Sequence, residues 1–241
     1  MKLNYLRKFL NEQNRTATLI SAFALILSVF AIIFCCFVLF AKTDDQVFNE
    51  NINKTVEIRV SMDGENWGYG TGCFIDRNGT ILTNKHMVYS EANASNYEKV
   101  QVRLPTESDF IDAEIKRISE NDDLATISIA RENTPYFVLA SKISDGQEIY
   151  TIGNPSGFGL SFAKGNVSSK LRNVQHNDKN ILAMQTSLVI NEGNSGGPVF
   201  DKAGKLVGLV SFRLKDSSGN VIQGVSFAVP ATQIQTFLTT K

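Results

Sequence analysis

Cysteine is scarce in this sequence. Only three of the 241 residues are cysteine, and two of them, Cys35 and Cys36, lie inside an apolar N-terminal run. Cys73 is left alone in the rest of the chain, which excludes a disulfide within the globular part. The fold must therefore rest on its hydrophobic core, as a domain of roughly 190 residues can. We expect Cys73, in the strand-like segment 72–75, to be a small buried core residue.

The sequence also lacks an excess of charge of either sign. Its 24 Lys and Arg residues balance its 24 Asp and Glu residues, so the formal net charge is zero. No overall field would attract a polyanion, and we expect no nucleic-acid partner. Histidine is rarer still, with two residues in the chain. Two well-separated histidines and one cysteine form no ligand cluster of familiar spacing, so we expect no metal and no cofactor.

A long apolar segment is present near the N-terminus. Residues 17–40 contain no charge and are long enough, as a helix, to cross a membrane. Basic residues precede the segment and acidic residues follow it, namely Lys2, Arg7, Lys8 and Arg15 before it and Asp44, Asp45 and Glu50 after it. The positive-inside tendency predicts a single-pass protein with residues 1–16 in the cytoplasm and the body on the periplasmic or extracellular side.

Two alternatives to a simple anchor start from the same segment. A removable signal peptide would have a shorter apolar part, and bulky Leu39 stands where a cleavage site needs a small residue. Lipidation of Cys35 or Cys36 is disfavoured because Phe34 occupies the position of a small residue. We interpret residues 17–40 as an uncleaved transmembrane helix, residues 41–51 as a polar linker and residues 52–241 as one globular domain.

The globular part reads as all-β. Short runs of β-branched and aromatic residues are separated by turn residues, and Asn78-Gly79 is a strong hairpin signal. The expected strands are 56–60, 74–75, 81–82, 100–104, 110–118, 124–130, 148–152, 162–171, 181–185, 206–212 and 221–229. This spacing suits a barrel or a sandwich. After Pro230, residues 231–238 are expected to form a short closing helix with Ile234, Phe237 and Leu238 on one side.

The most informative segment for chemistry is Gly193-Asn194-Ser195-Gly196-Gly197-Pro198. A serine that attacks a carbonyl must project from a tight loop, and that loop must direct backbone N–H groups at the oxygen that becomes negative. Flanking glycines allow the required backbone angles. We therefore predict Ser195 as a nucleophile and the loop Gly193, Asn194 and Ser195 as an oxyanion hole, with the N–H groups of Gly193 and Ser195 as its donor pair.

A serine nucleophile needs a base, and the base needs a carboxylate to orient it. His86 directly follows an expected strand, whereas His176 lies in a polar stretch that looks like an exposed loop tip. We therefore favour His86 as the base. Asp122 and Asp123 precede a buried-looking strand, where an acid could point into a cleft, and we predict that Asp123 orients His86.

These three segments, in the order His, Asp, Ser, resemble the trypsin-like serine proteases. The residues around each of them resemble the HtrA (Deg) branch of that family. The matching stretches are Thr83-Asn84-Lys85-His86-Met87-Val88, Asp123-Leu124-Ala125-Thr126-Ile127 and the whole of the 193–198 motif. The second match favours Asp123 over Asp122. Shorter matches extend the resemblance over most of residues 55–235, at 152–155, 165–168, 184–186 and 224–230.

The resemblance implies two six-stranded antiparallel barrels with the catalytic residues in the cleft between them. It implies that Ser211, Phe212 and Arg213 pair with an extended polypeptide substrate as an added strand. It further implies that Ile190 lines the pocket for the side chain preceding the cut, where a small or medium apolar side chain would fit. Trimers are common in the family, so a homotrimer is compatible with the resemblance.

The chain also departs from the family pattern. HtrA proteins usually continue into PDZ domains after the closing helix, whereas this sequence ends at Lys241, so we expect no peptide-tail sensing by such a module. Ser187-Leu188 replaces a common Asp-Ala, and Glu192 stands where proline or arginine is frequent. Either change could alter how readily the oxyanion loop adopts its active shape.

Two functional hypotheses follow, and one structural alternative opposes both. The first is a membrane-anchored serine endopeptidase acting on unfolded or partner proteins through an acyl-enzyme. The second is a protease-like domain that binds polypeptides without cleaving them. The structural alternative is that the glycine-rich motif is only a turn in an unrelated β protein, and the ordered His and Asp segments argue against it.

Overall fold

A computed structural model describes residues 2–40, 42–176, 179–216 and 218–240. The chain divides into two compact units, Met1–Thr43 and Asp44–Lys241. The first unit consists of one helix, α1 (Lys2–Phe40). Within α1 the stretch Asn11–Cys35 is long and apolar enough to cross a membrane, by length and composition. The helix begins well before residue 17, where the preceding segment contains the good helix formers Leu, Lys, Arg, Glu and Gln.

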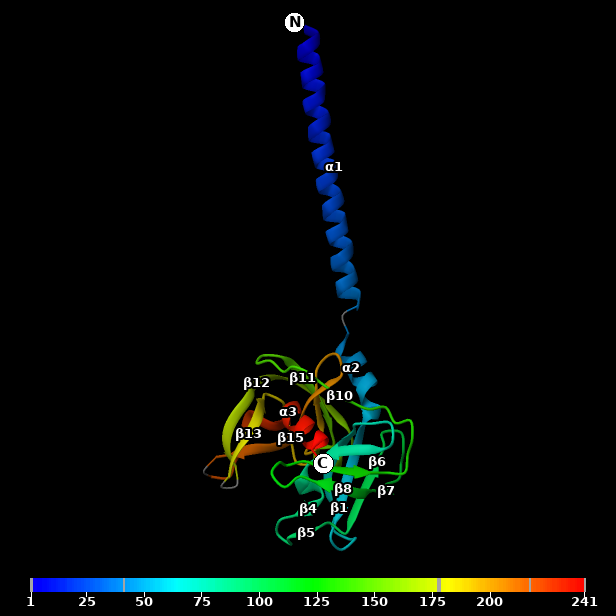
Figure 1. The fold of residues 1–241 in the computed structure, drawn as a ribbon, viewed down its shortest axis with the longest axis vertical. Coiled ribbons are helices and arrows are strands. Elements are labelled where there is room, and N and C mark those ends of the chain that lie inside the picture. The colour runs from blue at the N-terminus through cyan, green and yellow to red at the C-terminus, as the bar shows by residue number, and fades with distance from the viewer. Residues whose placement is uncertain (1, 41, 177–178, 217, 241) are drawn as a thin grey trace. The chain divides into compact units, whose positions relative to one another are not determined.

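The second unit is mostly strand, as Figure 1 shows. Its first half forms one antiparallel sheet in the order β7-β6-β1-β2-β3-β9-β8. The bounds of these strands are β1 Thr55–Ser61, β2 Gly68–Phe74, β3 Thr80–Thr83, β6 Lys99–Arg103, β7 Ile111–Asp112, β8 Glu114–Ile118 and β9 Ala125–Ser128. A separate pair consists of β4 (Tyr89–Ser90) and β5 (Ser95–Asn96). The predicted hairpin at Asn78-Gly79 joins β2 to β3.

The second half forms another sheet, in the order β10-β15-β14-β11-β12-β13-β16. The bounds are β10 Val138–Leu139, β11 Glu148–Gly153, β12 Ser161–His176, β13 Lys179–Thr186, β14 Pro198–Phe200, β15 Lys205–Lys215 and β16 Val221–Pro230. An additional β15–β16 pairing closes the six strands from β15 to β16 into a ring, and β10 lies outside it. The pairing of β10 with β15 is parallel, and the other pairings in this sheet are antiparallel.

The predicted all-β fold of two antiparallel barrels is present, with one difference in the first barrel. The expected strand 110–118 bends at Ala113, so that β7 pairs with β6 while β8 pairs with β9. The edges β7 and β8 do not pair with each other among the described residues, which leaves this barrel half closed. The chain passes directly from β7 to β8 through Ala113, whose N–H donates to Val100 O of β6 at 2.9 Å.

Buried side chains form three apolar clusters within the described ranges. One fills the first barrel around Ile58 and Phe74, and another fills the second barrel around Ile149 and Val199. The third combines residues of both halves, and its members include Cys73, Leu82, Leu124, Tyr150, Phe200 and Leu209. Cys73 is fully buried, as expected. This shared cluster fixes the two barrels against each other, and with them the groups that each one contributes to the space between.

The segment interpreted as a linker contains a helix, α2 (Asp44–Asn51). Val47 is fully buried in the shared cluster, and Phe48 packs edge-on against Phe162 with ring centroids 5.7 Å apart. The Tyr150 hydroxyl donates a hydrogen bond to Asp44 Oδ1 at 3.0 Å. The structured domain therefore begins at Asp44 rather than residue 52. The polar composition hid the helix because two apolar residues suffice to dock so short an element.

The predicted closing helix is present as α3 (Ala231–Thr239), with Ile234 and Phe237 buried. It packs on β15 and β16. Arg117 of β8 donates to Phe237 O at 2.7 Å and to Thr240 O at 2.6 Å, so a cation satisfies carbonyls at the C-terminal end of this helix. Because Arg117 belongs to the first barrel, α3 also links the two halves.

Candidate active site

The loop that carries Ser195 connects β13 to β14 and depends on its glycines. Gly193 has φ of +93° and Gly196 has φ of +80°. A Cβ on Gly193 would lie 2.1 Å from Asn154 O, and one on Gly196 would lie 2.2 Å from Thr71 O. Both contacts are with backbone oxygen, which cannot yield as a flexible side chain does. Glycine is therefore required at positions 193 and 196 for this turn to pack against the rest of the site.

Neighbouring groups hold the carbonyls of this loop. Thr71 Oγ1 donates to Gly193 O at 2.7 Å, and Thr71 N–H donates to Ser195 O at 2.9 Å. Ser156 N–H donates to Glu192 O at 2.7 Å. In a planar trans peptide the N–H group points opposite to the carbonyl. With the carbonyl of Glu192 directed at Ser156, the N–H of Gly193 is directed away from Ser156.

The N–H groups of the predicted oxyanion loop differ in their partners. Asn194 N–H donates to Asn191 O at 3.0 Å. Among the residues that the structure describes, the N–H groups of Gly193 and Ser195 have no hydrogen-bond acceptor. Two donors with one residue between them are thus available to a ligand. They are the N–H groups that the sequence predicts as the donor pair of an oxyanion hole, whereas the N–H of Asn194 is used within the turn.

His86 and Asp123 lie in direct contact. His86 belongs to a short 3-10 helix, η2 (Lys85–Met87), directly after β3, and Asp123 precedes β9, which pairs with β3. His86 Nδ1 lies 2.9 Å from Asp123 Oδ2 and 3.0 Å from Oδ1. The backbone N–H of His86 donates to Oδ1 at 3.1 Å, and Asn84 Nδ2 donates to the Asp123 carbonyl at 2.9 Å. Adjacent strands of one barrel thereby fix the pair.

The pair perturbs both pKa values. Burial alone lowers the pKa of His86, but the charge of Asp123 and the hydrogen bond to it outweigh burial and raise that pKa above its ordinary value. For Asp123, burial raises the pKa, but attraction to His86 and hydrogen bonds from His86 and Ser211 outweigh it and lower the pKa. A carboxylate that stays ionised beside an imidazole that binds its proton more firmly is suited to general base chemistry.

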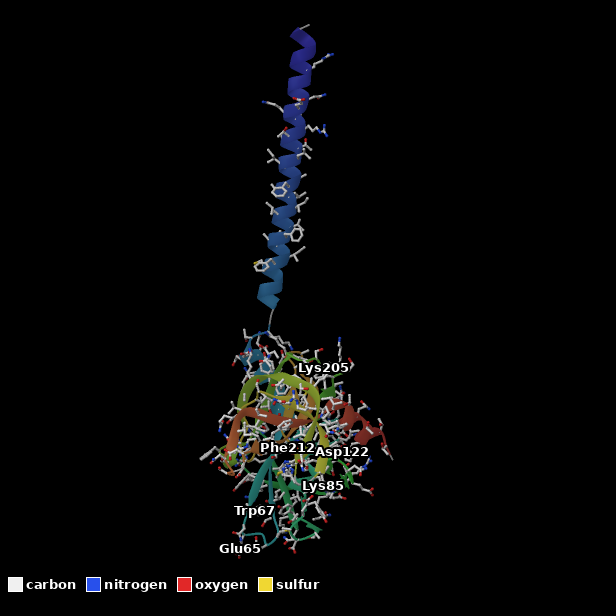
Figure 2. All side chains as sticks on the ribbon, turned by 90° about the vertical axis from the view of Figure 1, so that its left-hand side faces the viewer. Glu65, Trp67, Lys85, Asp122, Lys205 and Phe212 are labelled. Atoms are coloured by element: carbon white, nitrogen blue, oxygen red, sulfur yellow. The ribbon has the colours of Figure 1, made fainter. Side chains whose placement is uncertain are left out.

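Ser195 joins this pair through Ser211 of β15. Ser211 Oγ donates to Asp123 Oδ2 at 2.6 Å, and Ser195 Oγ donates to Ser211 O at 3.3 Å. Among the described residues Ser195 Oγ has no hydrogen bond to His86. The structure thus brings all three predicted catalytic residues into one region and connects them through Ser211. Figure 2 labels Lys85, Asp122 and Phe212 in the same part of the domain, and these are the sequence neighbours of His86, Asp123 and Ser211.

The predicted substrate-binding residues lie in three different environments. Ile190 is buried in the core cluster of the second barrel. Ser211 is buried, while Phe212 and Arg213 are half-buried, and Arg213 Nη1 donates to Asn191 Oδ1 at 3.1 Å. β14 pairs with β15 only up to Leu209, so the same edge of β15 has no strand partner from Ser211 onward among the described residues. An extended peptide could pair there.

His176 lies at the end of the β12–β13 hairpin, where it pairs with Lys179, but the prediction that it is exposed is wrong. His176 is the last residue of β12, is half-buried, and stacks on Phe212 with ring centroids 3.9 Å apart. Its pKa is lowered by burial, and it also experiences the charges of Asp123 and His86. The long β12–β13 hairpin carries it to the site. The sequence around it is polar because one face of that hairpin is exposed.

Thr71, Asn154 and Ser156 were not anticipated. Thr71 Oγ1 also accepts a hydrogen bond from Asn154 N–H at 3.0 Å, so one hydroxyl joins the oxyanion loop to the segment after β11. The signal for Thr71 was its position between Gly70 and Gly72, since glycines inside a strand mark close approach of another group. A Cβ on Gly70 would lie 2.3 Å from the Met87 side chain, next to His86.

No three His, Cys, Asp or Glu side chains converge in a manner that could hold a metal ion, in the part of the chain that the structure describes. The chemical capacity of the site lies instead in the imidazole–carboxylate pair, the Ser195 hydroxyl and the two available N–H groups.

Comparison with known proteins agrees with this geometry. The trypsin-like peptidase domain family matches residues 70–209. A probable periplasmic serine endoprotease, DegP-like, of Pseudomonas putida is 35% identical over 163 residues, which are 67% of this chain and 32% of that protein. Human serine protease HTRA3 is 31% identical over 176 residues, which are 70% of this chain and 37% of HTRA3. The chain thus spans about a third of the length of these relatives.

Solved structures show the same fold. The HtrA-type protease AlgW with a tripeptide aligns with a TM-score of 0.69 and 24% identity, covering 82% of this chain and 64% of AlgW. The active form of the Rv3671c protease from M. tuberculosis aligns with a TM-score of 0.68 and 19% identity, covering 80% of this chain and 82% of that one. At these identities the likeness concerns the fold.

Proposed function

Because the chain belongs to the trypsin-like peptidase family and is homologous to the DegP and HtrA serine proteases, we propose that it is a membrane-anchored serine endopeptidase. Its substrates are polypeptides, unfolded or partner proteins, that bind in extended form along β15. The relatives named as endoproteases support the reaction class, and the site supports the assignment of residues. The observation that carries the proposal is the contact of His86 Nδ1 with the Asp123 carboxylate, at 2.9 and 3.0 Å.

The proposed reaction begins with proton transfer. Asp123 holds the proton of His86 on Nδ1, which leaves Nε2 free to take the proton of Ser195 Oγ. The oxygen of Ser195 then forms a bond to the substrate carbonyl carbon, and the carbonyl oxygen becomes negative. The available N–H groups of Gly193 and Ser195 would stabilise that oxygen. His86 next donates its proton to the leaving amine, and the peptide C–N bond breaks.

The second half of the reaction regenerates the enzyme. Water gives a proton to His86 and attacks the acyl-enzyme, the bond between Ser195 Oγ and the acyl carbon breaks, and Ser195 recovers its proton. Both halves require Ser195 Oγ to break its hydrogen bond to Ser211 O, which is 3.3 Å long, and to turn toward His86. A bound peptide would favour this change, because its own N–H group would then compete for the Ser211 carbonyl.

Membrane attachment is the second part of the proposal. The uncharged run 17–40, which overlaps the candidate membrane span Asn11–Cys35, would serve as an uncleaved anchor, with the N-terminus in the cytoplasm and the domain from Asp44 onward in the periplasm or outside the cell. Mass spectrometry of the membrane-extracted protein should give the full 26.6 kDa. A mass shortened by the apolar run would instead identify a cleaved signal peptide. Protease added to spheroplasts should digest the domain without prior permeabilisation.

Hydrolysis of unfolded casein by the full-length chain in detergent tests the activity. We expect cleavage by the native protein, and a loss of several orders of magnitude in Ser195→Ala and in His86→Ala. Ser168→Ala, a change of an exposed serine on β12, is the matched control and should cleave normally. Equal cleavage by the native protein and Ser195→Ala would refute the assignment of the nucleophile.

A second candidate is a polypeptide-binding domain without catalysis. One observation favours it, namely that Ser195 Oγ donates to Ser211 O and not to His86. If this arrangement persisted with peptide bound, the serine would remain unactivated. Binding of a labelled peptide together with no reaction toward a fluorophosphonate probe would support this candidate over the protease.

A further inference from the structure

Three aromatic rings form a stack beside the site. Phe212 of β15 stacks on Phe227 of β16, with ring centroids 4.9 Å apart and an interplanar angle of 9°. His176 of β12 stacks on Phe212 at 3.9 Å and 23°. His176 and Phe227 make no ring contact with each other, so they cover opposite faces of Phe212. The face of Phe212 that Phe227 leaves open is thus occupied by the imidazole of the chain's second histidine.

The position of Phe212 relates this stack to the proposed substrate edge. Ser211 lies next to the reacting groups, since its carbonyl accepts from Ser195 Oγ and its hydroxyl donates to Asp123. If a substrate pairs with this edge, the residue whose carbonyl is attacked lies beside Ser211. The residue one position upstream then lies beside Phe212. Side chains of directly paired residues in adjacent strands share one face of the sheet.

The substrate side chain beside Phe212 would therefore compete with His176 for the same space. His176 is close enough to the reacting pair to experience the charges of Asp123 and His86. Burial lowers the pKa of His176, which favours the neutral form of the ring that closes this face. It acts as an apolar wall that is already in place before a peptide binds.

We propose that His176 determines specificity for the substrate side chain one position upstream of the residue at the cut. Its ring covers the face of Phe212 on which a large apolar side chain would rest, so that position accepts glycine, alanine or another small residue and excludes phenylalanine or leucine. This inference rests on the proposed protease function, because the register of the peptide is set by Ser195. It concerns a different subsite from the pocket expected at Ile190.

Two internally quenched peptides test the subsite on the full-length protein in detergent. Both carry valine before the cleaved bond, and they differ only in alanine or phenylalanine one position upstream. We expect the native protein to favour the alanine peptide by roughly 10-fold or more in kcat/KM, in the range typical for a hydrophobic pocket. His176→Ala should bring that ratio close to one by improving cleavage of the phenylalanine peptide.

Two further variants separate the ring of His176 from other effects. His176→Phe keeps an aromatic ring on Phe212 and should retain the preference for alanine. Leu171→Ala changes a half-exposed side chain on the same strand and should leave the ratio unchanged. An unchanged ratio in His176→Ala, or a native protein that prefers the phenylalanine peptide, would overturn the inference.

A binding measurement distinguishes this failure from failure of the proposed function. In a Ser195→Ala background, fluorescence anisotropy reports affinity for the same two peptides without turnover. We expect the added change His176→Ala to tighten binding of the phenylalanine peptide relative to the alanine peptide. If the native protein cleaves neither peptide and behaves as Ser195→Ala does, the protease function fails, and the anisotropy ratio still decides whether His176 closes the subsite.

Discussion

Replacing Gly193 by alanine tests the architecture of the oxyanion loop. The added Cβ would lie 2.1 Å from Asn154 O and 3.1 Å from the Asn154 carbonyl carbon. An unstrained contact between carbon and a carbonyl oxygen is about 3.3 Å or longer, so the two must separate by about 1.2 Å. Neither partner is a flexible side chain. The shift must therefore displace the backbone N–H group of residue 193 or the segment that holds it.

The magnitude follows from two separate effects. An L-residue at the φ of +93° that Gly193 adopts costs about 1–3 kcal/mol in stability, independently of any clash. Displacing one oxyanion donor lowers the rate by roughly 10²–10³-fold, and a misplacement of about 1 Å is sufficient for a loss of that size. We therefore expect Gly193→Ala to be folded, modestly destabilised and nearly inactive.

Gly159→Ala is the matched control. Gly159 has φ of +101°, yet a Cβ there would meet no atom within 4 Å. Its backbone strain is comparable, so both variants should lose similar stability in thermal unfolding. Only Gly193→Ala should react more slowly with the fluorophosphonate. Near-native labelling of Gly193→Ala, or an equal loss of labelling in both variants, would refute the assignment of this N–H group.

Three further predictions concern the acid, its support and the core. Asp123→Asn removes the carboxylate that raises the pKa of His86 most, so the acid limb of the kcat/KM profile should move to lower pH while the maximum falls about 10⁴-fold; an unmoved limb contradicts this. Ser211→Ala removes a hydrogen bond to Asp123 and should cost about 1–2 kcal/mol of unfolding free energy above pH 3.8, the ordinary pKa of Asp123. Because the folded pKa is lowered, this loss should disappear as the pH falls through it, and a pH-independent loss in chemical denaturation would count against it. Phe200→Ala should cost about 3–5 kcal/mol because its ring is fully buried, whereas the 90% exposed Phe158→Ala should change unfolding by under about 0.5 kcal/mol; equal effects would contradict the assigned core.

The strands and the closing helix were largely predictable because their signals are local, whereas the double-barrel arrangement followed only from the family resemblance. Strand alternation, the Asn78-Gly79 turn and the apolar side of 231–238 each depend on residues a few positions apart. The helix at Asp44–Asn51 was not predictable, because its stability comes from docking Val47 in a cluster assembled from distant segments. The bend at Ala113 likewise depends on pairing with two separate strands, β6 on one side and β9 on the other, which only the folded chain brings into place.

The candidate site was predictable to the extent that its chemistry restricts residue types. A serine among glycines, one well-placed histidine and an acid before a strand indicate their roles without coordinates. The links between them were not predictable, since Ser211 and Asp123 are 88 residues apart and Thr71 and Gly193 are 122 apart. His176 was misread because the pairing of β12 with β13, and not its local sequence, determines what the histidine contacts.

The most direct test of the central claim is intact-mass analysis of the full-length protein after exposure to a fluorophosphonate. We predict a single adduct, located on Ser195 by peptide mapping, and a labelling rate that falls by orders of magnitude in His86→Ala. No adduct on the native protein, or an adduct that forms equally fast without His86, would contradict the claim that these side chains act together.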